Sequence, residues 1–237
     1  MKIYRALRPI KAMTFDLDDT FYDNRPYIQH AYATLANYLA QYYPKTAALS
    51  AGTWATIRQG FIDADPRLES DVSALRLLTL EKALANDVND TTQRKQATQA
   101  CYDVFYAARS EFKVSDDVLK LLATLAERLP LIAITNGNVD CDAVGLRPYF
   151  QDVFHASVTR PMKPHRHMFD EASQRLGIAS ENILHVGDNL EKDVMGAVRA
   201  GYQAAWYADD RPMNLNNETV TLLPHIELAS LQELALF

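Results

Sequence analysis

Residues 10–20 read IKAMTFDLDDT, a short apolar-rich run that ends abruptly in acidic residues. The run Ile10–Phe15 is typical of a buried strand. Asp16, Asp18 and Thr20 would then lie at the carboxyl end of that strand, where open α/β sheets bind their ligands. The sequence therefore predicts a polar site directly after the first core strand.

The second half of the chain, from Ser115 onward, alternates between helical and strand patterns. Ser115 is a suitable helix N-cap, with Asp116 and Asp117 in the first turn. Further strands are predicted at 131–135, 153–158, 183–187 and 203–207. Helices are predicted between them, near 139–147, 167–176 and 190–200. Right-handed crossovers through such helices give an α/β fold with a Rossmann-like parallel sheet as its core.

Residues 24–109 interrupt this pattern with helical periodicity and no convincing strand. Apolar residues three and four apart indicate four helices, near 28–42, 54–61, 72–82 and 97–108. Pro44 and Pro66 end the first two. A length of 237 residues suits one large domain or two unequal pieces. We therefore expect an all-helical domain at 24–109 inserted into a core domain formed by 1–23 and 110–237.

Charge and composition limit the classes of binding partner that the protein can have. The formal net charge is −6, from 24 basic and 30 acidic residues. This disfavours nucleic acid or an anionic membrane, whereas one locally positive pocket can still bind a small phosphorylated metabolite. The two cysteines cannot form a disulfide framework, and neither a signal peptide nor a membrane-spanning run is visible. We expect a cytoplasmic protein with no membrane partner, and the choice between monomer and homodimer stays open.

Polar residues end three of the predicted strands at the same edge of the sheet: Asp16 to Thr20, Thr135-Asn136-Gly137 and Asp188-Asn189. Together with Asp193, the carboxylates of Asp16, Asp18 and Asp188 would lie close together, and like charges at such distances need compensation. Oxygen ligands of this kind suit Mg²⁺, which leaves coordination positions open for a phosphate. Lys163, before Pro164, can supply a second positive charge.

Each motif alone has a simpler interpretation. The acidic run at 16–20 could be a surface turn, whereas a calcium loop is excluded because Phe21 and Tyr27 stand where Gly and a bidentate Glu are required. Thr135-Asn136-Gly137 could be a hairpin turn, but no alternating strand follows it. Gly187-Asp188 could be a strand end before a helix. The order in which all the motifs occur favours a single site.

These residues resemble the four motifs of the haloacid dehalogenase (HAD) superfamily. The resemblance rests on Asp16-Leu17-Asp18-Asp19-Thr20, Thr135-Asn136-Gly137, Lys163-Pro164, and Gly187-Asp188 with Asp193. The helical insertion after the first motif is similar to the helical cap of that superfamily. The resemblance covers essentially the whole chain and implies a HAD-type phosphatase with a cap domain at 24–109.

The resemblance also implies roles for individual residues. Asp16 would be the nucleophile that forms an aspartyl-phosphate, and Asp18 would protonate the leaving oxygen and then deprotonate the attacking water. The Thr135 hydroxyl and the Asn136 backbone N–H would hold phosphate oxygens. Lys163 would screen the nucleophile from the anionic substrate.

The cofactor implied by the resemblance is Mg²⁺, bound by Asp16, the Asp18 carbonyl and Asp188, with Asp193 in support. Further stretches, such as 133–138, 183–188 and 222–225, resemble bacterial members regarded as phosphatases of flavin mononucleotide (FMN) and of 5-amino-6-(5-phospho-D-ribitylamino)uracil. These compounds are implied as substrates, and riboflavin biosynthesis as the setting.

Other functions remain open on the same scaffold. A broad-specificity sugar-phosphate phosphatase or a phosphomutase would share every core motif. Asp18 argues against carbon–halogen hydrolysis, which needs no acid two residues after the nucleophile, and no cap lysine has the apolar setting that a phosphonate hydrolase needs. A catalytically silent binding module is disfavoured because Asp16 and Asp18 are both present.

Four further features of the sequence carry predictions of their own. His185 alternates within a strand and is expected to be a packed core residue, and Cys141 is expected to be an unreactive thiol. His165 and His167 are expected to be solvated loop residues. Most cap aromatics should form the bundle core, with a minority facing a ring-bearing substrate: Tyr32, Trp54, Tyr102, Phe105 and Tyr106.

Overall fold

A seven-stranded sheet forms the core of the computed structural model, which describes residues 1–218 and 222–237. The strand order is β1-β7-β6-β5-β2-β3-β4, parallel except for the antiparallel pair β1 and β7. The strand bounds are β1 (Lys2–Ile3), β2 (Ala12–Phe15), β3 (Leu131–Thr135), β4 (Asp152–His155), β5 (Ile183–Gly187), β6 (Gln203–Trp206) and β7 (Ile226–Glu227). The predicted Rossmann-like α/β fold is confirmed.

The central strand β2 decides where the site lies. Every residue of β2, β3, β5 and β6 is buried, which explains why their sequences are apolar runs rather than alternating patterns. In the register, Phe15 pairs with Ala133 of β3 on one side and with Val186 of β5 on the other. The residues that follow these three strands therefore emerge together, at the point where the strand order reverses.

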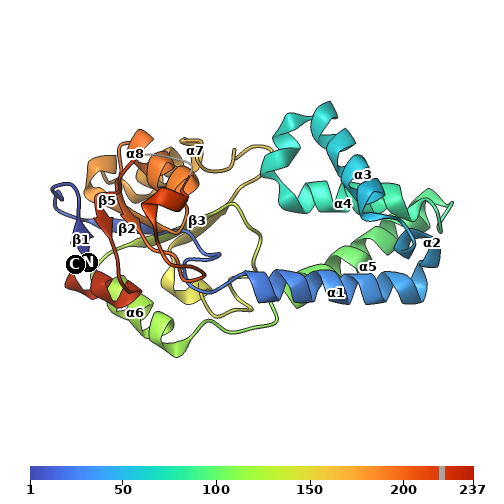
Figure 1. Ribbon diagram of the computed structural model, residues 1–237, viewed down its shortest axis with the longest axis horizontal. Coiled ribbons are helices and arrows are strands. Elements are labelled where there is room, and N and C mark those ends of the chain that lie inside the picture. Colours follow the sequence, from blue (N-terminus) through green and yellow to red (C-terminus); the bar gives the residue numbers. More distant parts are fainter. Residues whose placement is uncertain (219–221) are drawn as a thin grey trace.

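Eight α-helices are described in the structure, with α1 to α5 gathered to one side of the sheet (Figure 1). Their bounds are α1 (Arg25–Tyr42), α2 (Pro44–Ala47), α3 (Ala51–Ala64), α4 (Val72–Leu84), α5 (Thr91–Arg109), α6 (Asp116–Ala126), α7 (His167–Leu176) and α8 (Gly196–Arg199). Side-chain caps begin three of them: Ser50 accepts from Thr53 N–H, Asp71 from Ala74 N–H and Asp90 from Gln93 N–H. No helix in the described part of the chain has the length and apolar character needed to span a membrane.

Three apolar clusters hold the molecule together. One lies between the sheet and α6, the second joins the opposite face of the sheet to α7 and α8, and the third is internal to α1, α4 and α5. The third cluster includes Leu35, Leu84, Cys101 and Phe105, so the helical segment has an apolar core of its own.

The helix predicted near 139–147 is wrong. Residues 141–145 form turns, followed by a 3₁₀ segment at Arg147–Tyr149. Asp140 Oδ1 accepts hydrogen bonds from the N–H groups of Asp142 and Ala143, which caps a single turn closed by the bond from the Val144 N–H to the Asp140 carbonyl. Gly145 then adopts a left-handed φ of 89°, which ends any helical path.

Smaller differences occur at element boundaries. The predicted helix at 190–200 begins as a π-helical segment, Leu190–Met195, before α8. The two-residue strands β1 and β7 are too short to produce an alternating pattern and were not predicted. Helix α6 begins after Ser115 as expected, but the Ser115 side chain accepts no capping hydrogen bond.

Candidate active site

Three buried carboxylates meet at the carboxyl edge of the sheet. Asp16 follows β2, Asp188 follows β5, and Asp193 lies in the π-helical segment 190–195. Each offers an oxygen within 4.8 Å of the other two. Because β2 and β5 are parallel neighbours, the meeting of Asp16 and Asp188 follows directly from the register. π-Helical turns are frequent at functional sites, and this one directs Asp193 inward.

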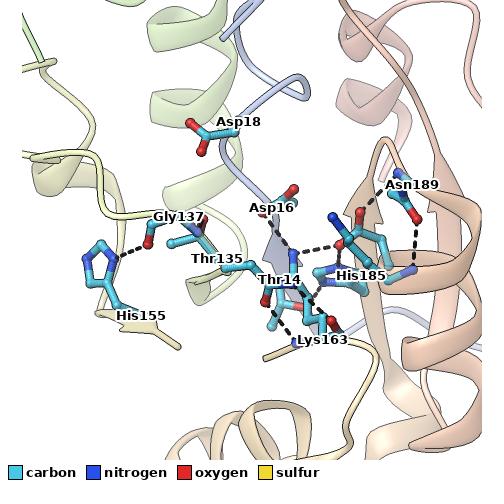
Figure 2. Close-up of polar contacts among 12 residues, drawn as sticks. Thr14, Asp16, Asp18, Thr135, Gly137, His155, Lys163, His185 and Asn189 are labelled. Atoms are coloured by element: carbon cyan, nitrogen blue, oxygen red, sulfur yellow. Dashed lines mark hydrogen bonds and ion pairs between the residues drawn. The ribbon is translucent and has the colours of Figure 1, made fainter. Parts of the chain in front are cut away.

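Lys163 supplies the positive charge at this edge. Its Nζ lies 2.8 Å from Asp16 Oδ1 and 2.6 Å from Asp193 Oδ1, and the side chain is 1% exposed (Figure 2). Burial alone would lower the pKa of Lys163, but Asp16 and Asp193 raise it. Burial raises the pKa of Asp16 well above its usual range, with Asp193 and Asp188 adding to the rise and Lys163 opposing it. The site is thus short of positive charge without a further cation.

Asp193 accepts three hydrogen bonds from protein donors. Its Oδ1 accepts from Lys163 Nζ and His185 Nε2, and its Oδ2 accepts from the Asn189 N–H at 3.0 Å. Although burial opposes it, Lys163 and His185 lower the pKa of Asp193. With every oxygen engaged, Asp193 is suited to hold Lys163 and the loop at 188–193 rather than to bind an ion directly.

His185 is buried, as expected for a core residue, but it also supports the site. Nε2 lies 3.1 Å from Asp193 Oδ1, and Nδ1 lies 2.9 Å from Thr14 Oγ1. Because a carboxylate can only accept, the Nε2–H tautomer donates to Asp193, and Nδ1 accepts from the Thr14 hydroxyl. Burial lowers the pKa of His185, which favours the neutral ring. Sequence reasoning missed these contacts because His185 and Thr14 lie within apolar strand patterns.

The Thr135-Asn136-Gly137 loop is held by a hydrogen bond within the loop and by two more to the backbone of Lys163. Thr135 Oγ1 accepts from the Gly137 N–H at 3.0 Å. Asn136 binds the backbone of Lys163, with Oδ1 accepting from its N–H at 2.8 Å and Nδ2 donating to its carbonyl at 3.0 Å. The second and third sequence motifs are therefore joined in the structure.

Asp18 is placed differently from the sequence prediction that four carboxylates cluster. Its carboxylate is not part of the three-carboxylate group and lies on the side of Gly137 (Figure 2). Oδ1 accepts from Tyr22 Oη at 2.7 Å and from Arg109 Nη2 at 2.6 Å. A left-handed turn at Asp19, with a φ of 60°, brings the chain back so that Tyr22 reaches Asp18. The Arg109 guanidinium draws the side chain away from the other carboxylates.

Arg211 is a second charged partner that the sequence did not indicate. Its Nη1 lies 3.0 Å from Asp188 Oδ2, and its Nη2 donates to the Asp188 carbonyl at 3.0 Å. Burial and the Asp193 charge raise the pKa of Asp188 to about 7, against the opposing effect of Arg211. A lone arginine in a polar loop after β6 carries no sequence signal that would assign it to the site.

A cavity of about 460 Å³ opens within the helical segment, between α1, α3 and α4. Its lining is largely apolar, with Tyr32, Trp54, Arg58 and Arg76 as the aromatic and cationic exceptions. The Arg76 guanidinium lies 3.5 Å from the centre of the Phe105 ring, a cation–π contact. Of the five cap aromatics expected mostly in the bundle core, only Phe105 is fully buried there, so that expectation is met only in part. Trp54 and Tyr102 pack half-buried against the core, Tyr106 stacks on Tyr102, and the exposed Tyr32 lines the cavity together with Trp54.

The first turn of α4 joins this cavity to the core. Ser73 Oγ accepts from Asn138 Nδ2 at 3.1 Å, and Asp71 Oδ2 accepts from the Val158 N–H at 3.4 Å. Val72, between them, lines the cavity. The helix that lines the cavity therefore contacts the loops that follow β3 and β4.

The remaining sequence predictions concern thiols and histidines. Burial raises the pKa of Cys141 to about 12, in keeping with an unreactive thiol. His165 and His167 lie in and next to an exposed loop, and among the described residues neither belongs to a metal-binding group.

Comparison with known proteins places this geometry in a family. The family model for haloacid dehalogenase-like hydrolases matches residues 10–201. The chain is 34% identical to the 5-amino-6-(5-phospho-D-ribitylamino)uracil phosphatase YigB of Escherichia coli (strain K12), over 99% of this chain and 98% of that protein. It is 25% identical to the N-acylneuraminate-9-phosphatase of Homo sapiens, over 97% and 94% of the two chains.

Solved structures agree. The crystal structure of a 2-haloacid dehalogenase from Pseudomonas syringae pv. Tomato DC3000 superposes with a TM-score of 0.87 at 33% identity, over 95% of this chain and 96% of that one. The family model, the full-length relatives and the shared architecture confirm the superfamily and the class of enzyme predicted from the sequence. The chain belongs to the haloacid dehalogenase-like hydrolases.

Proposed function

We propose that this hydrolase is a phosphatase that transfers the phosphoryl group of a small phosphorylated metabolite to Asp16 and then to water. The observation that carries the proposal is the contact of Lys163 Nζ with Asp16 Oδ1 at 2.8 Å, with a second carboxylate, Asp18, two residues later and outside that ion pair. One carboxylate is held beside a cation and is suited to attack phosphorus. The other is separately placed and is suited to move a proton.

In the first step, an Asp16 oxygen bonds to phosphorus while the bond from phosphorus to the leaving oxygen breaks, and Asp18 donates its proton to that oxygen. In the second step, Asp18 takes a proton from water, whose oxygen attacks the aspartyl-phosphate and restores the Asp16 carboxylate. Thr135 and the Asn136 N–H hold the phosphate oxygens, and Lys163 offsets their charge. These assignments follow the family's motif positions and the geometry around β2.

The donor set fits Mg²⁺. Within the described part of the chain, ion pairs reach only Oδ1 of Asp16 and Oδ2 of Asp188, which leaves one oxygen of each available to a hard cation. We assign the ion to Asp16, Asp188 and the Asp18 carbonyl, with Asp193 in support through Lys163 and the Asn189 N–H. When bound, Mg²⁺ would neutralise the charge of the phosphoryl group and the carboxylates.

For the substrate, we propose FMN and 5-amino-6-(5-phospho-D-ribitylamino)uracil, which places the enzyme in riboflavin metabolism. The near full-length similarity to YigB supports this choice. The cap cavity adds to it, because aromatic faces at Tyr32 and Trp54 and guanidinium donors at Arg58 and Arg76 suit a flat ring that carries carbonyl oxygens. The cap boundaries at 24 and 109 and the cytoplasmic location stay predictions.

Two other reactions have specific support. Similarity to N-acylneuraminate-9-phosphatase favours a sugar phosphate, and the solved 2-haloacid dehalogenase favours carbon–halogen hydrolysis. We favour phosphate ester hydrolysis over dehalogenation because Asp18, which accepts hydrogen bonds from Tyr22 and Arg109, has no task in displacing a halide. A phosphomutase would use the same core residues and differ in the acceptor.

A substrate panel tests the proposal. It contains FMN, the ribitylaminouracil phosphate, hexose phosphates, N-acetylneuraminate 9-phosphate and 2-chloropropionate, each with Mg²⁺, and measures released phosphate, released chloride and transfer to a second sugar. We expect the two ribityl compounds to have the highest kcat/KM. A specificity constant about tenfold higher for another phosphate would replace the substrate assignment, and chloride release without phosphate release would refute the phosphatase.

A further inference from the structure

The carboxylate of Asp18 is held by two donors that both end on Oδ1. Tyr22 Oη lies at 2.7 Å and Arg109 Nη2 at 2.6 Å. Tyr22 is a near neighbour along the chain, whereas Arg109 is the last residue of α5, 91 positions away. Arg109 is 2% exposed, so this ion pair is shielded from solvent on the arginine side.

The second oxygen faces the loop that follows β3. A Cβ built on Gly137 would lie 2.3 Å from Asp18 Oδ2 and 3.4 Å from Thr135 Oγ1. The Asp18 carboxylate therefore occupies the space that the missing side chain of Gly137 leaves open. Oδ2 lies beside the Thr135-Asn136-Gly137 loop, and within the described residues no hydrogen bond ends on it.

The arrangement around Arg109 is unfavourable for stability alone. Its Nη1 is buried and has no hydrogen-bond partner among the described residues. A buried charge with an unused donor carries a desolvation penalty, and apolar residues commonly replace buried ion pairs without loss of stability. Keeping an arginine here is explained better by what it does to Asp18 than by packing.

We propose that Arg109 is a positioning residue for Asp18, which fixes Oδ1 together with Tyr22 so that Oδ2 is the oxygen that passes the proton to the leaving group. Because Arg109 ends α5, the inserted helices and the acid of the core are coupled through one ion pair. The proposal rests on the acid–base role of Asp18 given under the proposed function. It assigns to the inserted segment a part in the chemistry, in addition to any contact with the substrate.

The test compares two leaving groups in Arg109→Met, Arg109→Lys and Tyr22→Phe. An alkyl phosphate, the best of the substrate panel, needs a proton on its leaving oxygen, whereas p-nitrophenyl phosphate does not. For Arg109→Met we expect kcat/KM to fall about 100-fold or more on the alkyl ester and less than about 10-fold on the aryl ester. Arg109→Lys should recover part of the loss. Tyr22→Phe removes a hydrogen bond but no charge. It should also slow the alkyl ester more than the aryl ester, with a loss on the alkyl ester of about 10-fold.

A double-mutant cycle separates positioning from structural damage. If Arg109 acts through Asp18, adding Arg109→Met to Asp18→Asn should change the alkyl-ester rate by less than about twofold. Arg94→Met is the matched control, because Arg94 lies about four turns earlier on α5 and bonds only backbone carbonyls. It should leave both esters unchanged.

Equal losses on the two esters, or an undiminished effect of Arg109→Met in the Asp18→Asn background, would overturn the proposal. If Arg109→Met does not fold, Arg109→Lys and Tyr22→Phe test the proposal instead. The quantity compared is again the loss of kcat/KM on the alkyl ester relative to the loss on the aryl ester. Failure of the proposed function is distinct: the unmodified enzyme would then release no phosphate from any ester, or Asp18→Asn would keep full activity.

Discussion

The side chain of Asn136 holds the backbone of Lys163 by two hydrogen bonds, accepting from its N–H at 2.8 Å and donating to its carbonyl at 3.0 Å. From that backbone position, Lys163 Nζ reaches both Asp16 and Asp193. The loop after β3 thus sets the place of the lysine as well as offering its own groups to a phosphate.

Asn136→Asp should impair catalysis while keeping the size of the side chain. One carboxylate oxygen would face the Lys163 carbonyl, and two acceptors cannot bond to each other. We expect kcat to fall about 10- to 100-fold with a smaller change in the melting temperature, measured by steady-state kinetics and thermal unfolding. Unchanged kcat in a folded Asn136→Asp variant would show that the position of Lys163 does not depend on this contact.

Asp16→Asn should abolish turnover, because an amide does not attack phosphorus. We expect a loss of about 1,000-fold or more in kcat, with a circular dichroism spectrum like that of the unmodified protein. Mass spectrometry must first exclude deamidation back to Asp. Retention of a tenth of the activity by intact Asp16→Asn would remove Asp16 from the role of nucleophile.

Mg²⁺ binding should be required for activity and should strengthen as the pH rises toward 7. The pKa of Asp188 is raised from 3.8 to about 7, so without the ion the folded chain keeps a proton there that the unfolded chain has lost. Between these two pKa values the folded, metal-free protein holds more protons at Asp188 than the unfolded chain does, so its stability falls as the pH rises. Mg²⁺ reverses this effect because it replaces the proton.

Calorimetry at several pH values and melting curves with and without Mg²⁺ measure both effects. Chelation should abolish turnover, and added Mg²⁺ should restore it. Asp188→Asn is the control, in which Mg²⁺ should no longer raise the melting temperature. Full activity after exhaustive chelation, or an Mg²⁺ affinity independent of pH from about 5 to about 7, would contradict the assignment of the ion.

Arg76→Met should weaken binding of a ring-bearing substrate without slowing the chemistry. Arg76 lines the cap cavity and lies against Phe105. It belongs to α4, the helix whose first turn contacts the core loops. We expect KM for FMN to rise about 5- to 30-fold, with kcat/KM for a small phosphate ester within about twofold of the original. The control is Lys82→Met, an exposed position on the same helix. Equal effects on both substrates would exclude the cavity as the ring site.

Gly187→Ala should destabilise the fold because a Cβ there would lie 2.3 Å from Asp193 Cγ. Displacing Asp193 strains a packed region and disturbs its bonds to Lys163 and His185, so we expect a loss of about 1–3 kcal/mol in the free energy of unfolding. Gly60→Ala in α3 is the matched control, since a Cβ added at Gly60 would have no neighbouring atom within 4 Å. It should stabilise the protein by roughly 0.5–1 kcal/mol. Denaturant unfolding of the pair distinguishes crowding from helix propensity.

The sequence alone was enough to predict the α/β sheet, the helical insertion and the edge where the polar motifs meet. Each of these depends on local patterns: an apolar run followed by Asp16, helical spacing between Arg25 and Arg109, and polar residues directly after strands. A parallel sheet brings strand ends together whatever the connecting segments contain. The failed helix near 139–147 marks the limit, because the left-handed backbone at Gly145 ends the helical path after a single turn.

Only the tertiary structure decided how the charges are paired. Arg109 reaches Asp18 across 91 positions, Arg211 reaches Asp188 across 23, and His185 reaches Asp193 from inside an apolar strand. No periodicity encodes such contacts, since they depend on where separate elements pack. The structure also shows that the Asp18 carboxylate lies apart from those of Asp16, Asp188 and Asp193. The buried guanidinium of Arg109 attracts it, whereas the other three carboxylates repel it.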